Sequence, residues 1–143
     1  MSPLLIASDH AGFALKKNLL NYLDKKRISV KDLGTYSADR CDYPVYAYIL
    51  AKMISSGEAK RGILICKSGI GNSIVANRLP GVRAALCDNL KIVKLSREHN
   101  DSNVLVLGSA FVTAYLAKKM IAVWLKTKFL GGRHLRRVKL IDK

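Results

Sequence analysis

A cysteine followed by a glycine-rich turn is the stretch of this sequence best suited to chemistry. Residues 62–71 read G-I-L-I-C-K-S-G-I-G, an apolar run that ends at Cys66 and a turn that contains Gly69 and Gly71. The apolar run predicts a buried strand, and the glycines allow a turn that points several backbone N–H groups at one place, ahead of a short helix. Such donors favour an anion and lower the pKa of a nearby thiol. The stretch therefore predicts a base beside an oxyanion site.

Other interpretations of the same stretch compete with this one. A cysteine at the end of an apolar strand is most often a small buried core residue, and position alone leaves that reading open for Cys66. Gly69 and Gly71 also begin a dinucleotide-binding pattern, with Asp88 downstream for a ribose hydroxyl. Ile74 occupies the position of the third glycine in that pattern, which disfavours a nucleotide site.

Further polar residues stand where predicted elements meet. The three histidines occur in the sequences Asp9-His10, Glu98-His99-Asn100-Asp101 and Arg133-His134. Asp9 suits either the N-cap of a helix or a partner for a histidine or a sugar hydroxyl. Arg133 and Arg137 are one helical turn apart, so that both guanidinium groups could meet one phosphate, although a solvated charged face is an equally good interpretation.

Alternating strands and helices must position these residues. Apolar runs predict strands at 4–7, 28–33, 63–65, 82–86 and 104–107. Helical periodicity and turn residues predict helices at about 12–25, 44–56, 72–79, 89–97 and 113–126. This alternation indicates an α/β fold with a parallel sheet and helices on both faces. The carboxyl ends of parallel strands share one edge, which brings Asp9, His10 and Cys66 to one crevice.

Composition limits the function classes. At 143 residues the chain is expected to be one domain, 1–143, and its formal net charge of +15 invites a nucleic-acid partner. The basic residues are scattered over several helices without a basic tail or an aromatic-studded strand, so we expect no specific nucleic acid but an attraction for small phosphorylated anions. We expect neither a membrane span nor a leader, and therefore a cytoplasmic protein. Three cysteines without metal-type spacing suggest no disulfide framework and no zinc site.

The carboxyl-terminal segment, 129–143, differs from the rest of the chain. Gly131 and Gly132 precede a short basic stretch that has few apolar residues with which to pack on its own domain. We therefore expect this tail to pack on a partner subunit.

Six motifs, taken together, resemble ribose-5-phosphate isomerase type B over nearly the whole chain. They are S-D-H-A-G (8–12), D-Y-P (42–44), G-I-L-I-C-x-S-G-I-G (62–71), G-V-R-A-A-L-C (81–87), S-R-E-H-N-D-x-N-V-L (96–105) and G-G-R-H-x-x-R (131–137). The resemblance implies a three-layer Rossmann-like sandwich with a five-stranded parallel sheet. It also implies a homodimer or dimer of dimers with active sites shared between subunits. The implied reaction is the interconversion of ribose 5-phosphate and ribulose 5-phosphate, without metal or cofactor.

The resemblance assigns roles to individual residues. Cys66 becomes the base that moves a proton between C1 and C2 through an enediolate, and Ser68 lies beside the reacting oxygens. His99, with Asp9 nearby, is expected to open the sugar ring. The substrate-binding positions are His10, Tyr43, Lys67, Gly69, Gly71, Asn100, Arg133 and Arg137. His99, Asn100 and the tail are expected to serve a site shared with the partner.

Two departures from the family pattern leave the substrate open. Many type B members have glycine where this chain has Lys67, and a phosphate-binding arginine where it has Ala110. Lys67 is hypothesised to compensate in part, at the oxyanion or through the pKa of Cys66. The alternatives are an isomerase of a hexose 6-phosphate, such as galactose or allose 6-phosphate, and a non-catalytic module that binds a sugar phosphate or a nucleic acid.

Overall fold

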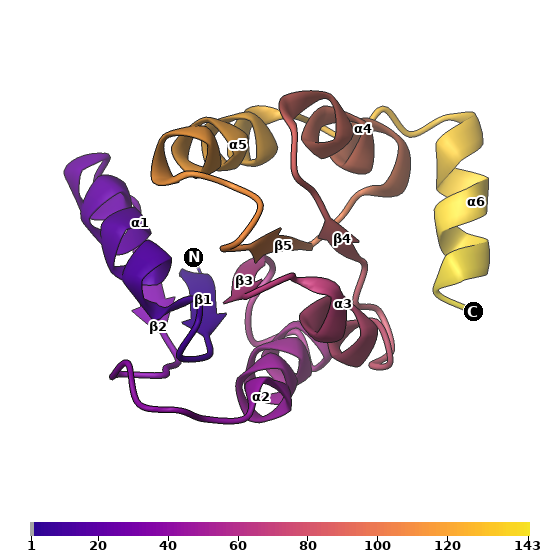
Figure 1. Cartoon of the computed structure of the whole chain (residues 1–143). Coiled ribbons are helices and arrows are strands. Elements are labelled where there is room, and N and C mark those ends of the chain that lie inside the picture. Colours follow the sequence, from indigo (N-terminus) through magenta and orange to yellow (C-terminus); the bar gives the residue numbers. More distant parts are fainter. Residues whose placement is uncertain (1) are drawn as a thin grey trace.

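Five parallel strands form the centre of the structure, a computed structural model that describes residues 2–143. In sheet order they are β2 (Val30–Asp32), β1 (Leu4–Ser8), β3 (Gly62–Cys66), β5 (Val104–Gly108) and β4 (Ala84–Leu86) (Figure 1). Every residue of the three inner strands is buried, which explains their continuous apolar sequences. The two edge strands are shorter and partly exposed. The predicted α/β class and the five-stranded parallel sheet are confirmed.

Helices cover both faces of this sheet and complete the three layers (Figure 1). One face carries α1 (Phe13–Lys25), α4 (Leu90–Asn100) and α5 (Ala114–Lys126), and the other carries α2 (Tyr43–Ser55) and α3 (Ile70–Ala76). Alternate residues along each strand pack into two separate apolar clusters, one on each face of the sheet. Leu4 and Ile6 pack with the α1, α4 and α5 side, whereas Leu5 and Ala7 pack with the α2 and α3 side.

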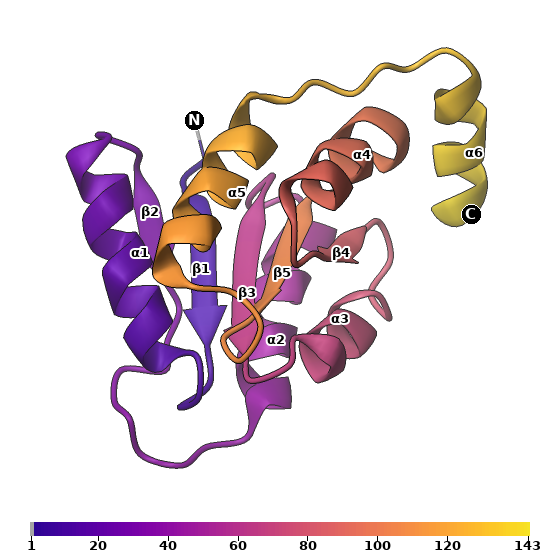
Figure 2. The same ribbon diagram turned by 45° about the horizontal axis from the view of Figure 1, so that its top comes forward.

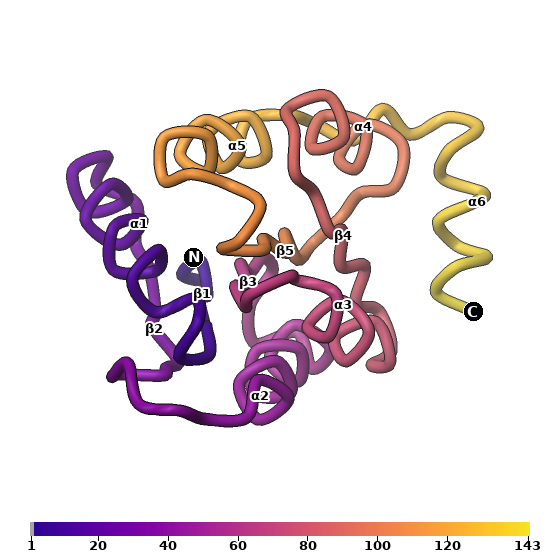
Figure 3. The backbone as a smooth tube through the Cα atoms, viewed as in Figure 1, coloured from indigo at the N-terminus to yellow at the C-terminus, as the bar shows by residue number. Residues whose placement is uncertain are grey.

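The connections of this sheet separate two edges of the molecule. The strands all end at one edge, which we call the carboxyl edge, and the arrowhead of β1 marks it at the bottom of Figure 2. The helices that follow β4 and β5 begin at that edge and return to the opposite, amino edge (Figure 2), and Figure 3 traces the same backbone from the viewpoint of Figure 1. The carboxyl edge therefore carries the residues that end the strands, and the amino edge carries the residues that end α4 and α5.

The basic tail forms a sixth helix, α6 (Arg133–Ile141), that stands apart from the three layers (Figures 1 and 2). Its buried residues are His134 and Val138, while Leu135 and Leu140 are exposed. It is held to the body at its far end, where Asp142 forms an ion pair with Arg83 at 2.8 Å. The sequence did not show that the tail would be helical, and its packing on a partner stays a prediction.

Several element boundaries differ from the predicted ones for local reasons. The helix predicted from Asn72 begins two residues earlier, because Gly69 adopts the left-handed conformation (φ 82°) and starts α3. The helix predicted to end at Arg97 continues to Asn100 and stops at Asp101, which is left-handed (φ 49°) and whose backbone N–H donates to the Arg97 carbonyl. The predicted strands 28–33 and 82–86 are shortened to their sheet-paired residues.

Within residues 2–143, none of the helices has both the length and the apolar character needed to cross a membrane.

Candidate active site

The carboxyl edge brings the predicted base beside an acidic side chain. β1 and β3 are neighbours, with Ser8 paired to Ile65, and the Asp9 backbone N–H donates to the Ile65 carbonyl at 3.3 Å. Strand alternation places Cys66 on the same face as Leu64, the face covered by α2 and α3. Cys66 belongs to neither apolar cluster of the described residues. Its sulfur therefore lies at the rim of the core, among polar groups.

The Cys66 thiol is buried and is held by the glycine turn. Its residue is 4% exposed, and the backbone N–H of Gly69 donates to the sulfur at 3.2 Å. Burial raises the pKa of Cys66, opposed by backbone N–H donors of Asn72, Gly69 and Ser68, while the charge of Asp9 raises it further. The turn amides thus lower this pKa as predicted, but desolvation outweighs them in the single chain and the net pKa is raised.

The glycines of the turn are required by close contacts. A Cβ on Gly69 would lie 2.4 Å from Leu86 Cδ1, and one on Gly71 would lie 2.4 Å from the ring of Tyr43. Ser68 shapes the same turn, since its Oγ accepts a hydrogen bond from the Ile70 N–H at 3.2 Å. The turn thus packs the Tyr43 ring directly over its backbone at Gly71.

This contact makes a testable prediction at Gly71. Gly71→Ala should lower the free energy of unfolding by about 1–3 kcal/mol, because the added methyl group overlaps the Tyr43 ring. Urea denaturation of both proteins measures the difference. In a Tyr43→Ala background the same substitution should cost little, since the ring is gone. An equal cost in both backgrounds would show that Tyr43 is not the obstacle.

Asp9 and His10 are fixed by neighbouring loops. Asp9 is 5% exposed, and its Oδ1 accepts from the Gly12 N–H at 3.0 Å. The N-cap of α1 is Gly12, so Asp9 closes the turn before the helix and the interpretation of Asp9 as the N-cap itself is wrong. His10 Nδ1 accepts from the Cys41 N–H at 3.2 Å. A neutral histidine that accepts at Nδ1 carries its proton on Nε2, so His10 offers an Nε2–H donor.

Lys67 and Ala110, the two departures from the family pattern, are neighbours. The Ala110 N–H donates to the Lys67 carbonyl at 2.9 Å, and Lys67 is exposed. A cation on the turn therefore lies beside the position where many family members carry an arginine. This placement suits the hypothesis that Lys67 compensates, without testing it.

A second cluster of predicted residues lies at the amino edge. His99 and Asn100 are the last residues of α4, and the ring of His99 stacks on that of His134 with 4.2 Å between centroids and 12° between planes. Desolvation, and then the charges of His99, Arg133 and Arg137, lower the pKa of His134. Arg133 and Arg137 themselves are exposed on α6.

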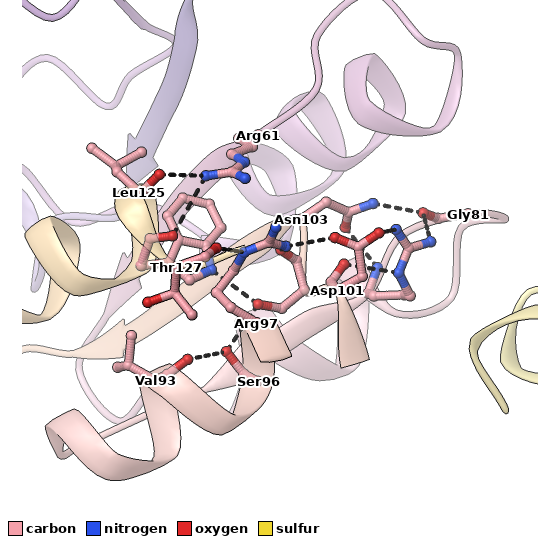
Figure 4. A network of polar contacts seen from close by, with 12 residues as sticks. Arg61, Gly81, Val93, Ser96, Arg97, Asp101, Asn103, Leu125 and Thr127 are labelled. Carbon is pink, nitrogen blue, oxygen red and sulfur yellow. Dashed lines mark hydrogen bonds and ion pairs between the residues drawn. The ribbon is translucent and has the colours of Figure 1, made fainter. Parts of the chain in front are cut away.

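A network of buried polar groups anchors the end of α4 (Figure 4). Arg97 is 4% exposed and donates to the carbonyls of Thr127 (3.2 Å) and Ser102 (2.6 Å) and to the carboxylate of Asp101 (2.8 Å). The Leu130 N–H donates to the Glu98 carbonyl at 3.1 Å, which ties the segment before α6 to the same helix end. Sequence reasoning included Arg97 in a motif but missed this role, because its burial is visible only in the fold.

The structure therefore divides the predicted site into two sets. The thiol half-site, at the carboxyl edge, comprises Asp9, His10, Tyr43, Cys66, Lys67, Ser68, Gly69 and Gly71. The arginine half-site, at the amino edge, comprises His99, Asn100, Arg133, His134 and Arg137. Within one chain His99 is thus not beside Asp9, and the predicted pairing requires two chains. His134 was seen in the sequence as one of three junction histidines but was given no role there.

A cavity of ≈ 640 Å³ lies near the arginine half-site, between the segment 77–85 and the end of α6. Asn100 lines it, together with Arg78, Arg83 and Asp142. The cavity lies toward the amino edge, whereas Cys66 ends β3 at the carboxyl edge, so Cys66 does not act in this cavity.

No group of three or more His, Cys, Asp or Glu side chains within residues 2–143 is arranged to hold a metal ion.

Comparisons with known proteins agree with one another. Residues 4–141 match the family model described as Ribose/Galactose Isomerase. The chain is 43% identical over 141 residues to ribose-5-phosphate isomerase B of Escherichia coli, which covers 99% of this chain and 95% of that protein.

Solved structures extend this similarity to three dimensions. A ribose 5-phosphate isomerase from Thermotoga maritima has a TM-score of 0.95 at 48% identity, covering 99% of this chain and 97% of that one. A ribose-5-phosphate isomerase B from Mycoplasma genitalium, solved with bound ribulose-5-phosphate, has a TM-score of 0.94 at 41% identity, covering 98% and 93%.

Proposed function

Because the chain belongs to the ribose/galactose isomerase family, we propose that it is an aldose–ketose isomerase that interconverts ribose 5-phosphate and ribulose 5-phosphate. Relatives that match nearly its whole length carry the name ribose-5-phosphate isomerase B, and one has been solved with bound ribulose-5-phosphate. The observation in this chain that carries the proposal is the Cys66 thiol, fixed by a turn of backbone N–H groups beside Asp9.

Cys66 acts as the base in this reaction. As the thiolate it removes the proton from C2 of the open-chain aldose and returns it to C1, with an enediolate between the two steps, and the proton of the C2 hydroxyl passes to O1 while the enediolate exists. The raised pKa makes the thiol a weaker acid and its thiolate a stronger base, which suits abstraction from carbon. The turn amides that bond to the sulfur stabilise the thiolate, while the Ser68 hydroxyl, whose oxygen accepts from the Ile70 N–H, can donate to the negative charge that develops on a substrate oxygen.

His10 and Asp9 bind the sugar beside this base. The Nε2–H of His10 is a donor for a phosphate or hydroxyl oxygen, and its Nδ1 bond to Cys41 fixes the ring orientation. The Tyr43 ring, packed over Gly71 and 38% exposed, lines the approach to the turn. The exposed Lys67 adds a cation next to Ala110.

The complete site requires two chains, which form a homodimer or a dimer of dimers. Each site combines the thiol half-site of one chain with the arginine half-site of its partner. In support, α6 lies outside the three layers, contacts its own body at α4 through His134, and exposes Leu135 and Leu140, as a helix that also packs on a second copy would. Arg133 and Arg137 are then a phosphate clamp on the substrate end far from the reacting carbons, and His99 opens the ring.

Galactose 6-phosphate or another hexose 6-phosphate is the second candidate substrate. Ala110 favours this substrate, since a small residue beside the turn leaves room at the phosphate end and the family includes galactose isomerases.

The three free cysteines suit a location in the reducing cytoplasm, because Cys66 must stay reduced to act.

An isomerisation assay of the purified protein tests the function directly. Ribose 5-phosphate, allose 6-phosphate and galactose 6-phosphate are compared at equal concentrations. The proposal predicts the highest kcat/KM for ribose 5-phosphate. A higher kcat/KM for a hexose phosphate would identify the protein as an isomerase of that hexose phosphate. Binding without turnover of any of the three would identify it as a non-catalytic binding module.

A further inference from the structure

Asn72, the third residue of α3, has a buried side chain that the fold does not use. It is 2% exposed, and its Oδ1 has no hydrogen-bond partner. Within residues 2–143 the other buried side-chain atom without a partner is Ser8 Oγ. A buried amide oxygen that accepts nothing destabilises the folded chain, so its presence calls for a reason outside folding.

The position of Asn72 connects it to the chemistry. It follows directly on the turn whose Gly69 N–H donates to the Cys66 sulfur at 3.2 Å, and its own backbone N–H is among the groups that lower the pKa of Cys66. α3 packs on β3 and β5 through its buried residues, Asn72 and Ala76. The unpartnered amide therefore belongs to Asn72, a residue whose backbone N–H affects the pKa of Cys66. Asn72 is the third residue of α3, the helix that follows the glycine turn.

Asn77, at the end of the same helix, shows that unpaired amides are not a general feature of this region. Its Nδ2 donates to the Ala84 carbonyl at 3.0 Å, and its Oδ1 accepts from the Ala84 N–H at 2.7 Å. Asn77 thus uses both ends of its amide to fix the start of β4. The two asparagines are chemically identical and five residues apart, yet only Asn77 is used by the fold.

The proposed reaction needs a hydrogen-bond acceptor at the place where Asn72 lies. The open-chain aldose presents a carbonyl oxygen at C1 and a hydroxyl at C2. The Ser68 hydroxyl, whose oxygen already accepts from the Ile70 N–H, is a donor for the carbonyl oxygen. The C2 hydroxyl needs an acceptor, and a neutral one is best, because a second carboxylate beside Asp9 would repel the enediolate.

We propose that Asn72 is a substrate-binding residue whose Oδ1 accepts the hydrogen bond of the C2 hydroxyl of the aldose, and of the C1 hydroxyl of the ketose. This inference rests on the proposed isomerase function. Asn72 moves no proton; it holds the two substrate oxygens in one plane while Cys66 acts on the carbons between them. The amide left unpaired by the fold is then paired by the substrate.

Asn72→Leu, of similar volume and without polar atoms, separates this role from a structural one. We expect its urea midpoint to equal or exceed that of the wild-type protein, because an unpaired acceptor is removed. We also expect its kcat/KM for ribose 5-phosphate to fall by about 10- to 100-fold, the loss of one hydrogen bond to the reacting group. Asn72→Ala, which adds no apolar bulk, should lose activity to a similar extent.

Asn77→Leu is the matched control, with the same substitution at the paired amide. Its urea midpoint should fall, while kcat/KM per folded molecule stays within about twofold of wild type. Wild-type kcat/KM in both Asn72 variants, or a fall in stability with unchanged turnover per folded molecule, would overturn the role of Asn72. Absence of turnover in the wild-type protein with every sugar phosphate would instead overturn the proposed function, and this role with it.

Discussion

Cys66→Ala should lower kcat for ribose 5-phosphate by about 10²- to 10⁴-fold while changing KM little, since the base acts only in the transition state. The sulfur accepts the Gly69 N–H at 3.2 Å and lies beside Asp9, and alanine leaves no basic atom in its place. Steady-state kinetics together with ligand binding by calorimetry measure the two quantities separately.

Cys87 provides the matched control for this substitution. It is also buried, with its pKa raised to about 11 by burial, but it packs within the apolar cluster of α1, α4 and α5. Cys87→Ala should cost stability and leave kcat within about twofold. Unchanged kcat in Cys66→Ala would remove the thiol from the mechanism.

The pH dependence of the reaction follows from the same thiol. Burial, opposed by the turn amides, raises the pKa of Cys66, so the thiol of the free chain is mostly protonated at neutral pH. Only the thiolate is a base, and kcat/KM should therefore increase as the pH rises from neutral toward the pKa of Cys66. A profile that falls over this range would contradict the assignment.

The second large effect is expected at the tail. The double substitution Arg133→Ala and Arg137→Ala should lower kcat/KM by about 10²- to 10⁴-fold, because two charge-assisted contacts to the phosphate are lost together. Inorganic phosphate should also cease to inhibit competitively. Both arginines are exposed on α6 of the isolated chain, so their removal should leave the unfolding midpoint nearly unchanged.

Arg136 is the control for charge alone. It is exposed on the same helix, and Arg136→Ala removes one positive charge, against two in the double variant, without touching the proposed clamp. Kinetics of Arg136→Ala close to wild type would confirm that position, and not net charge, matters. An equal loss of kcat/KM in Arg136→Ala would show that the tail acts only through general electrostatic attraction for phosphate.

Much of the fold could be predicted from local sequence patterns. The continuous apolar runs of β1, β3 and β5 indicated buried parallel strands, and the Gly69 and Gly71 turn could be placed because left-handed and close-packed backbone requires glycine. Parallel strands fix a common carboxyl edge, so the proximity of Asp9 to Cys66 followed from the same pattern.

Other features of the site depend on tertiary burial, which local patterns do not report. The net rise in the pKa of Cys66 was missed because the burial of the sulfur outweighs the amide donors, and the sequence shows only those donors. The separation of His99 from Asp9 depends on where α4 ends, which the Arg97 network determines. The unpartnered oxygen of Asn72 has no sequence signal at all.

The central claim is that one active site takes its thiol from one chain and its arginines from another, and subunit mixing tests it most directly. Cys66→Ala and the Arg133→Ala, Arg137→Ala double variant are each inactive alone by this account. Unfolded together in equal amounts and refolded, they should recover about a quarter of wild-type activity, since half of the dimers are mixed and each has one intact site. Activity that stays at the level of the separate variants would show that thiol and arginines must come from the same chain, and would contradict the account.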